Sequence, residues 1–487
     1  MPASSHIEPI YDTIHSVYPG RPRLVLGSTF SVSNSRRLQH IVMEETTVED
    51  SLKRVILGAL PKTRVQSVQA TAAAGLHRIY RATTQDGGII QCSLPPSPNR
   101  LILRCEYGSI RSEAAVLQWL SWLGKGRPES DSPKSKTVDF EEDKKEARNR
   151  IRVDAISEYL PKLLDHGVSG SLHPLQYNVI LPRPGRLLSM LAIPLTAAER
   201  RSIDFQIGQM LRGMSLLRSP ASRFGNAENM LPPAPQRSSS AQCRASLQAP
   251  SESFTKWSDA FGHMLQSAIQ DAQANQITAS YDSIRRLLHR FTHVLDGVLE
   301  PRLVFVDAGL DKNVLVAMQE AESDEPGTSE SDNVTADELD SSESESSGSA
   351  ATPVKVTGLR EWIKPVFGDP LMSVIFCQAP SESLLRGFCT SLPDTLDDMD
   401  EVSESLSQKR QHAQIRLNLY RIYHALNAIS VEYIRRDVDS DPRELRARKA
   451  LVEAVRELEA LDEAETSKRR RRCLEVTSSK RHKTLSP

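Results

Sequence analysis

The chain has 487 residues, 39% of them hydrophobic and 25% charged, with a formal net charge of −1 at pH 7. A chain of this length can bury a large core, and we expect one two-lobed domain with long insertions. The near-neutral charge predicts no specific nucleic-acid partner, and no apolar stretch is long enough to cross a membrane.

The cysteines and the N-terminus indicate the cellular compartment. Six cysteines are scattered along the chain without a Cys-x-x-Cys pair, which argues against a zinc site or a disulfide framework. The N-terminus lacks the basic start and the apolar run of a signal peptide. We therefore expect an intracellular protein, cytoplasmic or nuclear, with no membrane partner.

The first part of the chain predicts a small β-rich region. Residues 1–46 are irregular, and apolar residues at helical spacing predict a helix over Thr47–Leu60. A turn of small residues containing Gly75, and then an Asp-Gly-Gly turn, separate three alternating segments. These segments predict strands over Val65–Ala70, Arg78–Ala82 and Ile89–Cys92.

A helix and an apolar strand follow, separated by an insert. Helical periodicity predicts Ser109–Leu123 as the helix, with Glu113 near its start. Residues 124–150 are polar and contain few apolar side chains, so we expect disorder there. Tyr177–Leu181, which includes Asn178 and Val179, reads as a buried strand.

The strand at Tyr177 is placed at the boundary between two lobes, an N-lobe of residues 47–176 and a helical C-lobe of residues 177–461. Within the C-lobe, Thr196 and Glu199 have the spacing of a capping box that starts a helix. Residues 226–252 are rich in Pro, Ser, Ala and Gln and predict a second disordered insert.

Two separated halves of one polar motif lie between Arg302 and Pro370. The first half has an apolar entry, a loop carrying Asp307, Asp311 and Asn313, and an apolar exit. The second half is a β-branched run that ends at Glu361 and is followed by Gly368-Asp369-Pro370. Phosphoryl transfer requires this set, namely an acid that orients the attacking hydroxyl and an amide and a carboxylate that hold magnesium. Either half alone also fits a plain strand–turn–strand.

An acidic insert separates the two halves, and the chain ends in a basic tail. Residues 317–352 contain no Lys or Arg and predict a third disordered insert. After two further helices, residues 462–487 form a basic tail that we expect to be disordered. Its clusters Lys468–Arg472 and Lys480–Lys483 predict either binding to a nuclear-import receptor or a solvated tail with no such role.

Together, the two halves resemble the aminoglycoside phosphotransferase-like, or choline kinase-like, family of the protein kinase-like superfamily, in a divergent branch common in fungi. The match is carried by Asp307, Asn313, Glu361 and Gly368-Asp369-Pro370. The chain departs from the family pattern by Phe305 in place of His, by one extra residue before Asn313 and by Glu361 in place of Asp. The resemblance implies an α+β, bilobal kinase-like fold with a small β-rich N-lobe, a mainly helical C-lobe and three disordered inserts.

The resemblance implies ATP and Mg²⁺ as cofactors and a small-molecule hydroxyl as the acceptor. Asp307 is then the catalytic acid/base, with Asp311 as the second candidate because of the stretched loop. Asn313 and Glu361 are the metal ligands, and Asp369 braces the loop.

The resemblance also implies how the N-lobe holds the nucleotide. The Gly75 turn would cover the phosphates, Glu113 would pair with the third strand, and the backbone of Asn178 and Val179 would bind adenine. Gln91 stands where the family has a phosphate-binding Lys, and it supplies no positive charge. Arg100 and Arg104 are the nearby residues that could compensate. The plain alternatives are a hairpin tip for Gly75 and a solvated position for Glu113.

Three functions remain open from the sequence. The first is an active phosphotransferase, and the second is a catalytically inactive pseudokinase that serves as a binding or scaffolding module. Gln91, Phe305 and the stretched loop favour the pseudokinase, whereas the surviving Asp, Asn and carboxylate favour the enzyme. The third is a nuclear regulatory protein that acts through its acidic insert and basic tail.

Overall fold

The computed structural model describes residues 48–71, 75–125, 149, 152–169, 175–232, 252–318, 354–390 and 406–483. The chain divides into two compact units, Met1–Ser51 and Leu52–Pro487, and all the labelled strands and helices belong to the second unit. Of the first unit, residues 48–51 are described and are helical. The segment 1–46 and most of the three expected inserts lie outside the described residues.

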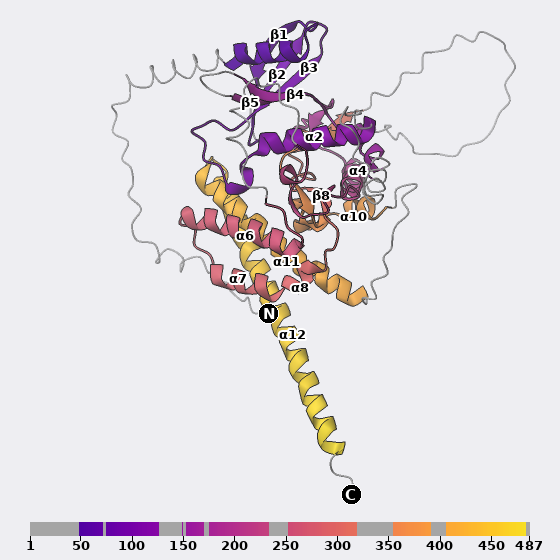
Figure 1. The fold of residues 1–487 in the computed structure, drawn as a ribbon, viewed down its shortest axis with the longest axis vertical. Coiled ribbons are helices and arrows are strands. Elements are labelled where there is room, and N and C mark those ends of the chain that lie inside the picture. Colours follow the sequence, from indigo (N-terminus) through magenta and orange to yellow (C-terminus); the bar gives the residue numbers. More distant parts are fainter. Residues whose placement is uncertain are drawn as a thin grey trace, which may run out of the picture. The chain divides into compact units, whose positions relative to one another are not determined.

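A five-stranded antiparallel sheet forms the N-terminal part of the second unit (Figure 1). Its strand order is β1-β2-β3-β5-β4. The strands are β1 (Val65–Ala70), β2 (Arg78–Thr84), β3 (Ile89–Leu94), β4 (Lys162–Ser169) and β5 (Leu175–Leu181). The three predicted N-lobe strands are confirmed, because local alternation and turn residues specify them.

Helix α2 (Ser109–Lys125) connects this sheet to the rest of the unit. It contacts β4 and β5 of the sheet, and also β11 of the C-terminal part. Trp119 and Leu120 are buried in a core that also contains Leu303 and Phe305 of β8. Burying apolar side chains of this size stabilises the fold by about 2 kcal/mol each, so α2 holds the two parts together.

The C-terminal part is mainly helical, with two small three-stranded sheets of order β10-β9-β6 and β7-β11-β8. The helices are α4 (Ala197–Ser215), α6 (Trp257–Ala274), α7 (Tyr281–Arg290), α8 (Thr292–Asp296), α9 (Val374–Cys377), α10 (Glu382–Cys389), α11 (Leu406–Ile434) and α12 (Ser440–Lys483). The short strands are β6 (Arg186–Leu187), β7 (Gly225–Asn226), β8 (Arg302–Phe305), β9 (Val314–Met318), β10 (Val354–Leu359) and β11 (Pro365–Gly368). The α+β arrangement expected from the sequence, an antiparallel sheet followed by a helical region, is confirmed.

The start of α4 confirms the predicted capping box. Thr196 Oγ1 accepts the backbone N–H of Glu199 at 3.2 Å, and the Glu199 carboxylate accepts the backbone N–H of Thr196 at 2.7 Å. Two otherwise unpaired donors of the first turn are thereby satisfied locally, which is why four residues suffice to predict the helix start.

Several boundaries differ from those expected. Tyr177–Leu181 belongs to β5, which lies between β3 and β4, so the change to the helical part comes after Leu181. The second insert does not begin at residue 226, because β7 pairs with β11 and Met230 and Leu231 are buried. Helix α12 does not end at Leu461 but continues to Lys483 through the expected disordered tail.

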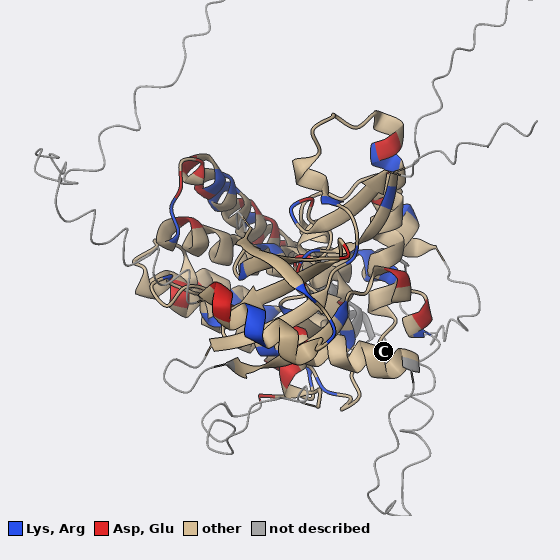
Figure 2. Ribbon diagram, turned by 90° about the horizontal axis from the view of Figure 1, so that it is seen from above, with Lys and Arg blue, Asp and Glu red and all other residues tan. Residues whose placement is uncertain are grey.

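None of the described helices is long and apolar enough to cross a membrane. Figure 2 shows basic and acidic residues interspersed along the described elements. The side chains of the basic clusters Lys468–Arg472 and Lys480–Lys483 lie outside the described part of the structure, so the nuclear-import hypothesis stays a prediction.

Candidate functional site

Two strand pairings bring the halves of the polar motif together. Strand β10 pairs with β9 in antiparallel register, from Val354 opposite Met318 to Leu359 opposite Val314. Asn313 immediately precedes β9 and the residues after Leu359 immediately follow β10, so they meet at one end of the hairpin. Arg360 N–H donates to the Asn313 carbonyl at 2.8 Å.

The second pairing places Asp307 beside Lys364. Strand β11 pairs with β8, with Pro365 opposite Phe305. Asp307 follows β8 and Lys364 precedes β11, so the antiparallel register sets their side chains at the same end. Lys364 Nζ lies 3.4 Å from Asp307 Oδ2, and the two side chains are 23% and 24% exposed.

The Asn313 side chain joins the two halves through the backbone. Its Nδ2 donates to the carbonyls of Glu361 at 3.1 Å and Asp307 at 3.4 Å, and its Oδ1 accepts the Glu361 N–H at 3.0 Å. A buried amide with both ends bonded to main chain fixes the relative position of two loops. Asn313 therefore holds Asp307 and Glu361 in place.

Asp307 is kept ionised by its neighbours. Burial acts to raise the pKa of Asp307, but the positive charges of Lys364 and Lys312 outweigh it, and the net shift is downward. The Lys364 pKa, which burial acts to lower, is raised instead by Asp307, Cys105 and Glu106. At neutral pH the pair is a carboxylate beside an ammonium.

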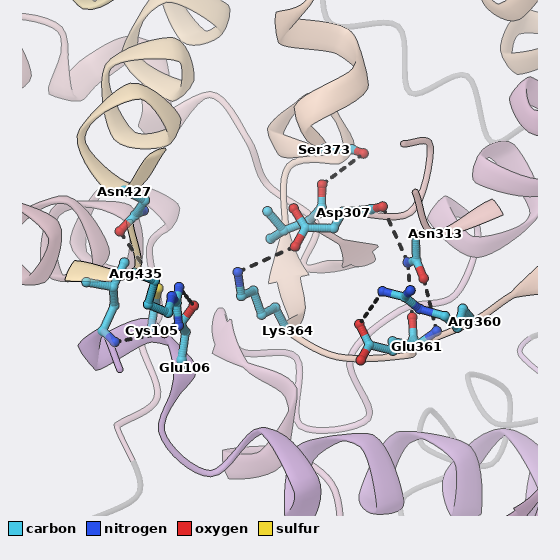
Figure 3. A network of polar contacts seen from close by, with 12 residues as sticks. Cys105, Glu106, Asp307, Asn313, Arg360, Glu361, Lys364, Ser373, Asn427 and Arg435 are labelled. Carbon is cyan, nitrogen blue, oxygen red and sulfur yellow. Dashed lines mark hydrogen bonds and ion pairs between the residues drawn. The ribbon is translucent and has the colours of Figure 1, made fainter. Parts of the chain in front are cut away.

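Glu361 is more deeply buried, with 6% of its side chain exposed. Arg360 Nη2 lies 3.4 Å from Glu361 Oε2, and Oε1 is buried with no hydrogen-bond partner among the described residues (Figure 3). Burial raises the pKa of Glu361, and Arg360 opposes that rise. Glu361 thus keeps one oxygen available.

Gly75 lies directly against the Glu361 carboxylate. A Cβ placed on Gly75 would be 2.6 Å and 2.8 Å from the two Glu361 carboxylate oxygens and 3.0 Å from Arg360 Nη2. Real Cβ atoms do not approach that closely, so a Cβ on Gly75 would require the ends of the Glu361 and Arg360 side chains to shift. Gly75, expected in the turn over the phosphates, here packs against the expected metal-binding residue.

Glu113 does not pair with Gln91. Its carboxylate accepts Asn178 Nδ2 at 2.9 Å and the Trp362 N–H at 3.1 Å, and it is 1% exposed rather than solvated. Gln91 Nε2 instead donates to Ser93 Oγ at 3.3 Å. Glu113 therefore links α2 and β5 to the residue after Glu361.

The backbone of Asn178 and Val179 is not free to bind adenine. Asn178 pairs with Ser93 and His166, and Val179 pairs with Cys92 and Asp165, in the ladders on the two sides of β5. The N–H and C=O groups of an interior strand face its neighbouring strands, so they are already satisfied. The expected adenine contact is therefore not available, because β5 lies between β3 and β4. Local sequence does not reveal that position.

Asp311 and Asp369 have separate partners. Arg200 of α4 binds the Asp311 carboxylate through two hydrogen bonds of 2.7 Å and 3.1 Å. Asp369 accepts hydrogen bonds from Leu371 N at 3.1 Å and from the Tyr420 hydroxyl at 2.7 Å. Arg200 thus holds Asp311, the second catalytic candidate, in an ion pair, whereas Asp369 braces its own turn against α11.

Phe305, at the position where the family has His, has a packing role. Its ring meets that of Trp362 edge to face, with centroids 4.9 Å apart and an interplanar angle of 86°. Contacts of this kind contribute about 1 kcal/mol beyond area burial. The aromatic pair joins β8 to the loop that carries Glu361.

The residues fit a magnesium ion that is shared with phosphate oxygens. The described residues contain no cluster of three or more His, Cys, Asp or Glu that could hold a metal alone. Magnesium usually takes one or two protein carboxylates and completes its shell with phosphate and water, and the unpartnered Oε1 of Glu361 suits that arrangement. Asn313 was also expected as a ligand, but its amide is bonded to backbone.

Sequence reasoning missed Arg360 and Lys364, the two cations of the site. Both flank Glu361 in the sequence, and a basic residue next to a motif carboxylate was the available signal. Lys364 has a φ of +54°, a left-handed conformation that is uncommon outside glycine. That backbone geometry between β10 and β11, which the sequence does not predict, accompanies the close approach of Lys364 to Asp307.

No protein-family model matches the chain, and no curated protein sequence matches it. Among solved structures, the chain resembles a protein described as a fructosamine-3-kinase from Thermobifida fusca YX-ER1, with 12% identity, a TM-score of 0.42 and coverage of 81% of this chain and 94% of that one. It also resembles a protein described as an aminoglycoside phosphotransferase from Ralstonia eutropha JMP134, with 11% identity, a TM-score of 0.42 and coverage of 84% and 98%.

Other structural neighbours are aminoglycoside and macrolide phosphotransferases, including one solved with GDP and kanamycin at 12% identity and a TM-score of 0.39, with coverage of 85% of this chain and 98% of that one. The neighbours are thus small-molecule phosphotransferases of the protein kinase-like superfamily. At this identity and TM-score, the likenesses decide neither the activity nor the site residues of this chain.

Proposed function

We propose that this protein is a phosphotransferase-like protein that binds ATP with magnesium and acts on the hydroxyl of a small molecule. One observation supports the proposal above the others. Asp307 and Glu361 come from distant parts of the sequence, and the Asn313 side chain holds their backbones together by donating two hydrogen bonds and accepting one.

The chemistry assigns each residue a role. Asp307 orients the acceptor hydroxyl and accepts its proton, and Lys364 keeps that carboxylate ionised. Glu361 would hold magnesium, and Asn313 positions both loops. Magnesium, when bound with the nucleotide, supplies positive charge to the phosphates.

The acceptor would enter through a recess beside Lys364. This recess is lined by, among others, Cys105, Ser109, Ser112, Asn226, Lys364 and Tyr423. Hydroxyl and amide groups of this kind bind polar small molecules by hydrogen bonding. Lys364 lines the recess and contacts Asp307. An acceptor bound in the recess would therefore have its hydroxyl close to Asp307.

A pseudokinase is the second candidate, and a different observation favours it. Asp307 and Glu361 both face cations of the chain itself, Lys364 and Arg360, and Gly75 lies against Glu361. The two carboxylates are thus already neutralised by the protein's own cations. A nucleotide could enter only if these ion pairs and the contact of Gly75 with Glu361 were broken. Such a protein would keep the fold as a binding or scaffolding module.

Thermal unfolding with ATP, with and without magnesium, tests the two candidates. Selective binding stabilises a fold by RT ln(1 + [L]/Kd), so a real site should raise the unfolding midpoint by several degrees at about 1 mM ATP. We expect a magnesium-dependent shift that Glu361→Gln abolishes and that the matched control Asp282→Asn, at a fully exposed aspartate of α7, preserves.

Activity separates the candidates further. Release of ADP in the presence of a panel of polyols, amino sugars and ketosamines should be lost in Asp307→Asn, while nucleotide binding remains. Binding without any transfer would favour the pseudokinase. If ATP produces no shift with or without magnesium, both the enzyme and a nucleotide-binding pseudokinase are contradicted.

A further inference from the structure

Arg360 is a buried cation with unused hydrogen-bonding capacity. Its side chain is 16% exposed, and its one contact with a carboxylate, to Glu361 Oε2, is long at 3.4 Å. Its Nε is buried and has no hydrogen-bond partner among the described residues. A guanidinium has five donors in a planar fork that matches the oxygens of a phosphate, so most of this fork is available.

Arg100 also reaches Gly75. Its Nη1 donates to the Gly75 carbonyl at 3.1 Å, and a Cβ on Gly75 would be 3.0 Å from Arg360 Nη2. The pKa of Arg100 is lowered by burial and by Arg435, while Glu106 and Glu361 act to raise it. Two guanidinium groups therefore converge on the Gly75 turn and Glu361.

Arg104, the other candidate to replace the missing lysine, is engaged elsewhere. Its Nη1 lies 2.5 Å from Asp271 Oδ1 and its backbone N–H donates to Asp271 Oδ2 at 2.9 Å. Asp271 lies on α6, so Arg104 is tied to the helical part. Arg100 and Arg104 are only four residues apart, but Arg100 contacts Gly75 whereas Arg104 contacts Asp271.

We propose that Arg360, assisted by Arg100, supplies the positive charge that Gln91 does not, and that these two arginines bind the phosphate chain of the nucleotide beside Gly75. The inference rests on the proposed function for the identity of the ligand, a polyphosphate. On binding, the Arg360 fork exchanges its long contact with Glu361 for charge-assisted hydrogen bonds to phosphate oxygens. Glu361 is released at the same moment for its own cation.

Calorimetric titration with inorganic tripolyphosphate, ATP and AMP tests this site. Arg360→Gln should weaken binding of tripolyphosphate and ATP by about tenfold or more, with a smaller loss for Arg360→Lys, which keeps the charge without the fork. AMP, which lacks the phosphate chain, should show little change. The matched control Arg104→Gln should leave all three affinities within about twofold, because its partner Asp271 lies outside the site.

A rescue experiment uses the position of the missing lysine. Adding Gln91→Lys to Arg360→Gln should restore part of the affinity for tripolyphosphate, because it returns a positive charge to the position where the family has its phosphate-binding Lys. Far-UV circular dichroism of each variant verifies folding. If Arg360→Gln does not fold, Arg360→Lys and Arg100→Gln decide by the same titrations.

Two results would overturn the inference. One is a wild-type protein that does not bind tripolyphosphate, and the other is an arginine variant that binds it as the wild type does. The outcomes stay distinct from those of the proposed function. If tripolyphosphate binding depends on Arg360 but the protein shows no transfer activity, the phosphate site is supported and the enzyme is contradicted. If transfer occurs and is unaffected by Arg360→Gln, the enzyme is supported and the phosphate site is contradicted.

Discussion

Glu113 lies at a helix position that looks solvated in the sequence but is almost fully buried in the structure. Burial raises its pKa from the ordinary value of 4.5 to about 7, while the hydrogen bonds from Asn178 and Trp362 N–H act to lower it. Periodicity places a side chain on a helix face, but it does not say which other segment covers that face. The Glu113 carboxyl therefore joins α2 to β5 and to the loop that carries Glu361.

Glu113 makes the stability of the protein depend on pH. Between pH 4.5 and about 7 the folded protein keeps a proton on Glu113 that the unfolded chain has released, so stability is lost as pH rises through this window. The loss is about 3 kcal/mol when complete.

We expect the unfolding midpoint of the wild type to fall more than that of Glu113→Gln between about pH 5 and pH 8. The amide of the variant does not titrate. It will nevertheless lower stability at every pH, because its NH₂ group faces a donor, Asn178 Nδ2 or the Trp362 N–H. Glu382→Gln, at an exposed glutamate of α10, should keep the slope of the wild type. Equal slopes for the wild type and Glu113→Gln would contradict the assignment.

Helices α4 and α10 cross at two glycines. A Cβ on Gly387 would be 2.1 Å from the Phe205 carbonyl oxygen, and one on Gly208 would be 2.2 Å from the Leu384 carbonyl oxygen. These neighbours are backbone atoms that cannot rotate away, so the crossing requires glycine on both helices. Because α4 supplies Arg200 for Asp311, the crossing also orients the loop between Asp307 and Asn313.

We expect Gly387→Ala to destabilise the protein by about 3 kcal/mol or to prevent folding, because the two helices must separate. Gly262→Ala in α6 is the matched control. Its Cβ would find Leu288 Cδ2 at 3.8 Å, an ordinary contact, so it should stabilise the protein by about 0.5–1 kcal/mol through helix propensity. Urea unfolding measures both. A Gly387→Ala protein as stable as the wild type would contradict the crossing.

At the scale of the whole molecule, the β9–β10 hairpin makes one site from two distant sequences. Met318 and Val354 pair across the hairpin, and the acidic insert leaves the chain between them. The paired ends are already at the separation that a tight turn bridges, so the insert is not needed to bring them together.

We expect a variant in which Asn-Gly replaces residues 319–353 to fold with an unfolding midpoint within about 5 °C of the wild type. It should also retain any magnesium-dependent shift with ATP, because the site lies at the other end of the hairpin. Replacing residues 314–318 with serines is the negative control. Loss of cooperative unfolding in the Asn-Gly variant would show that the insert contributes to the fold.

The sequence by itself determined the local elements and the residue types present in the polar motif. Strand β1, the Asp-Gly-Gly turn after β2 and the capping box at Thr196 all depend on side chains within a few positions of each other. Such signals are available without knowing what packs where. The α+β order of the chain follows from the same local patterns.

Only the tertiary structure decided how the site is used. In the structure the Asn313 side chain bonds to backbone, and Arg200 binds Asp311. Asn178 binds Glu113, and Val179 lies on an interior strand of the sheet. The structure also placed Lys364 on Asp307 and Arg360 on Glu361. Each of these contacts depends on strand register and on which faces meet, and these are set by long-range packing that residue types at fixed spacing do not encode.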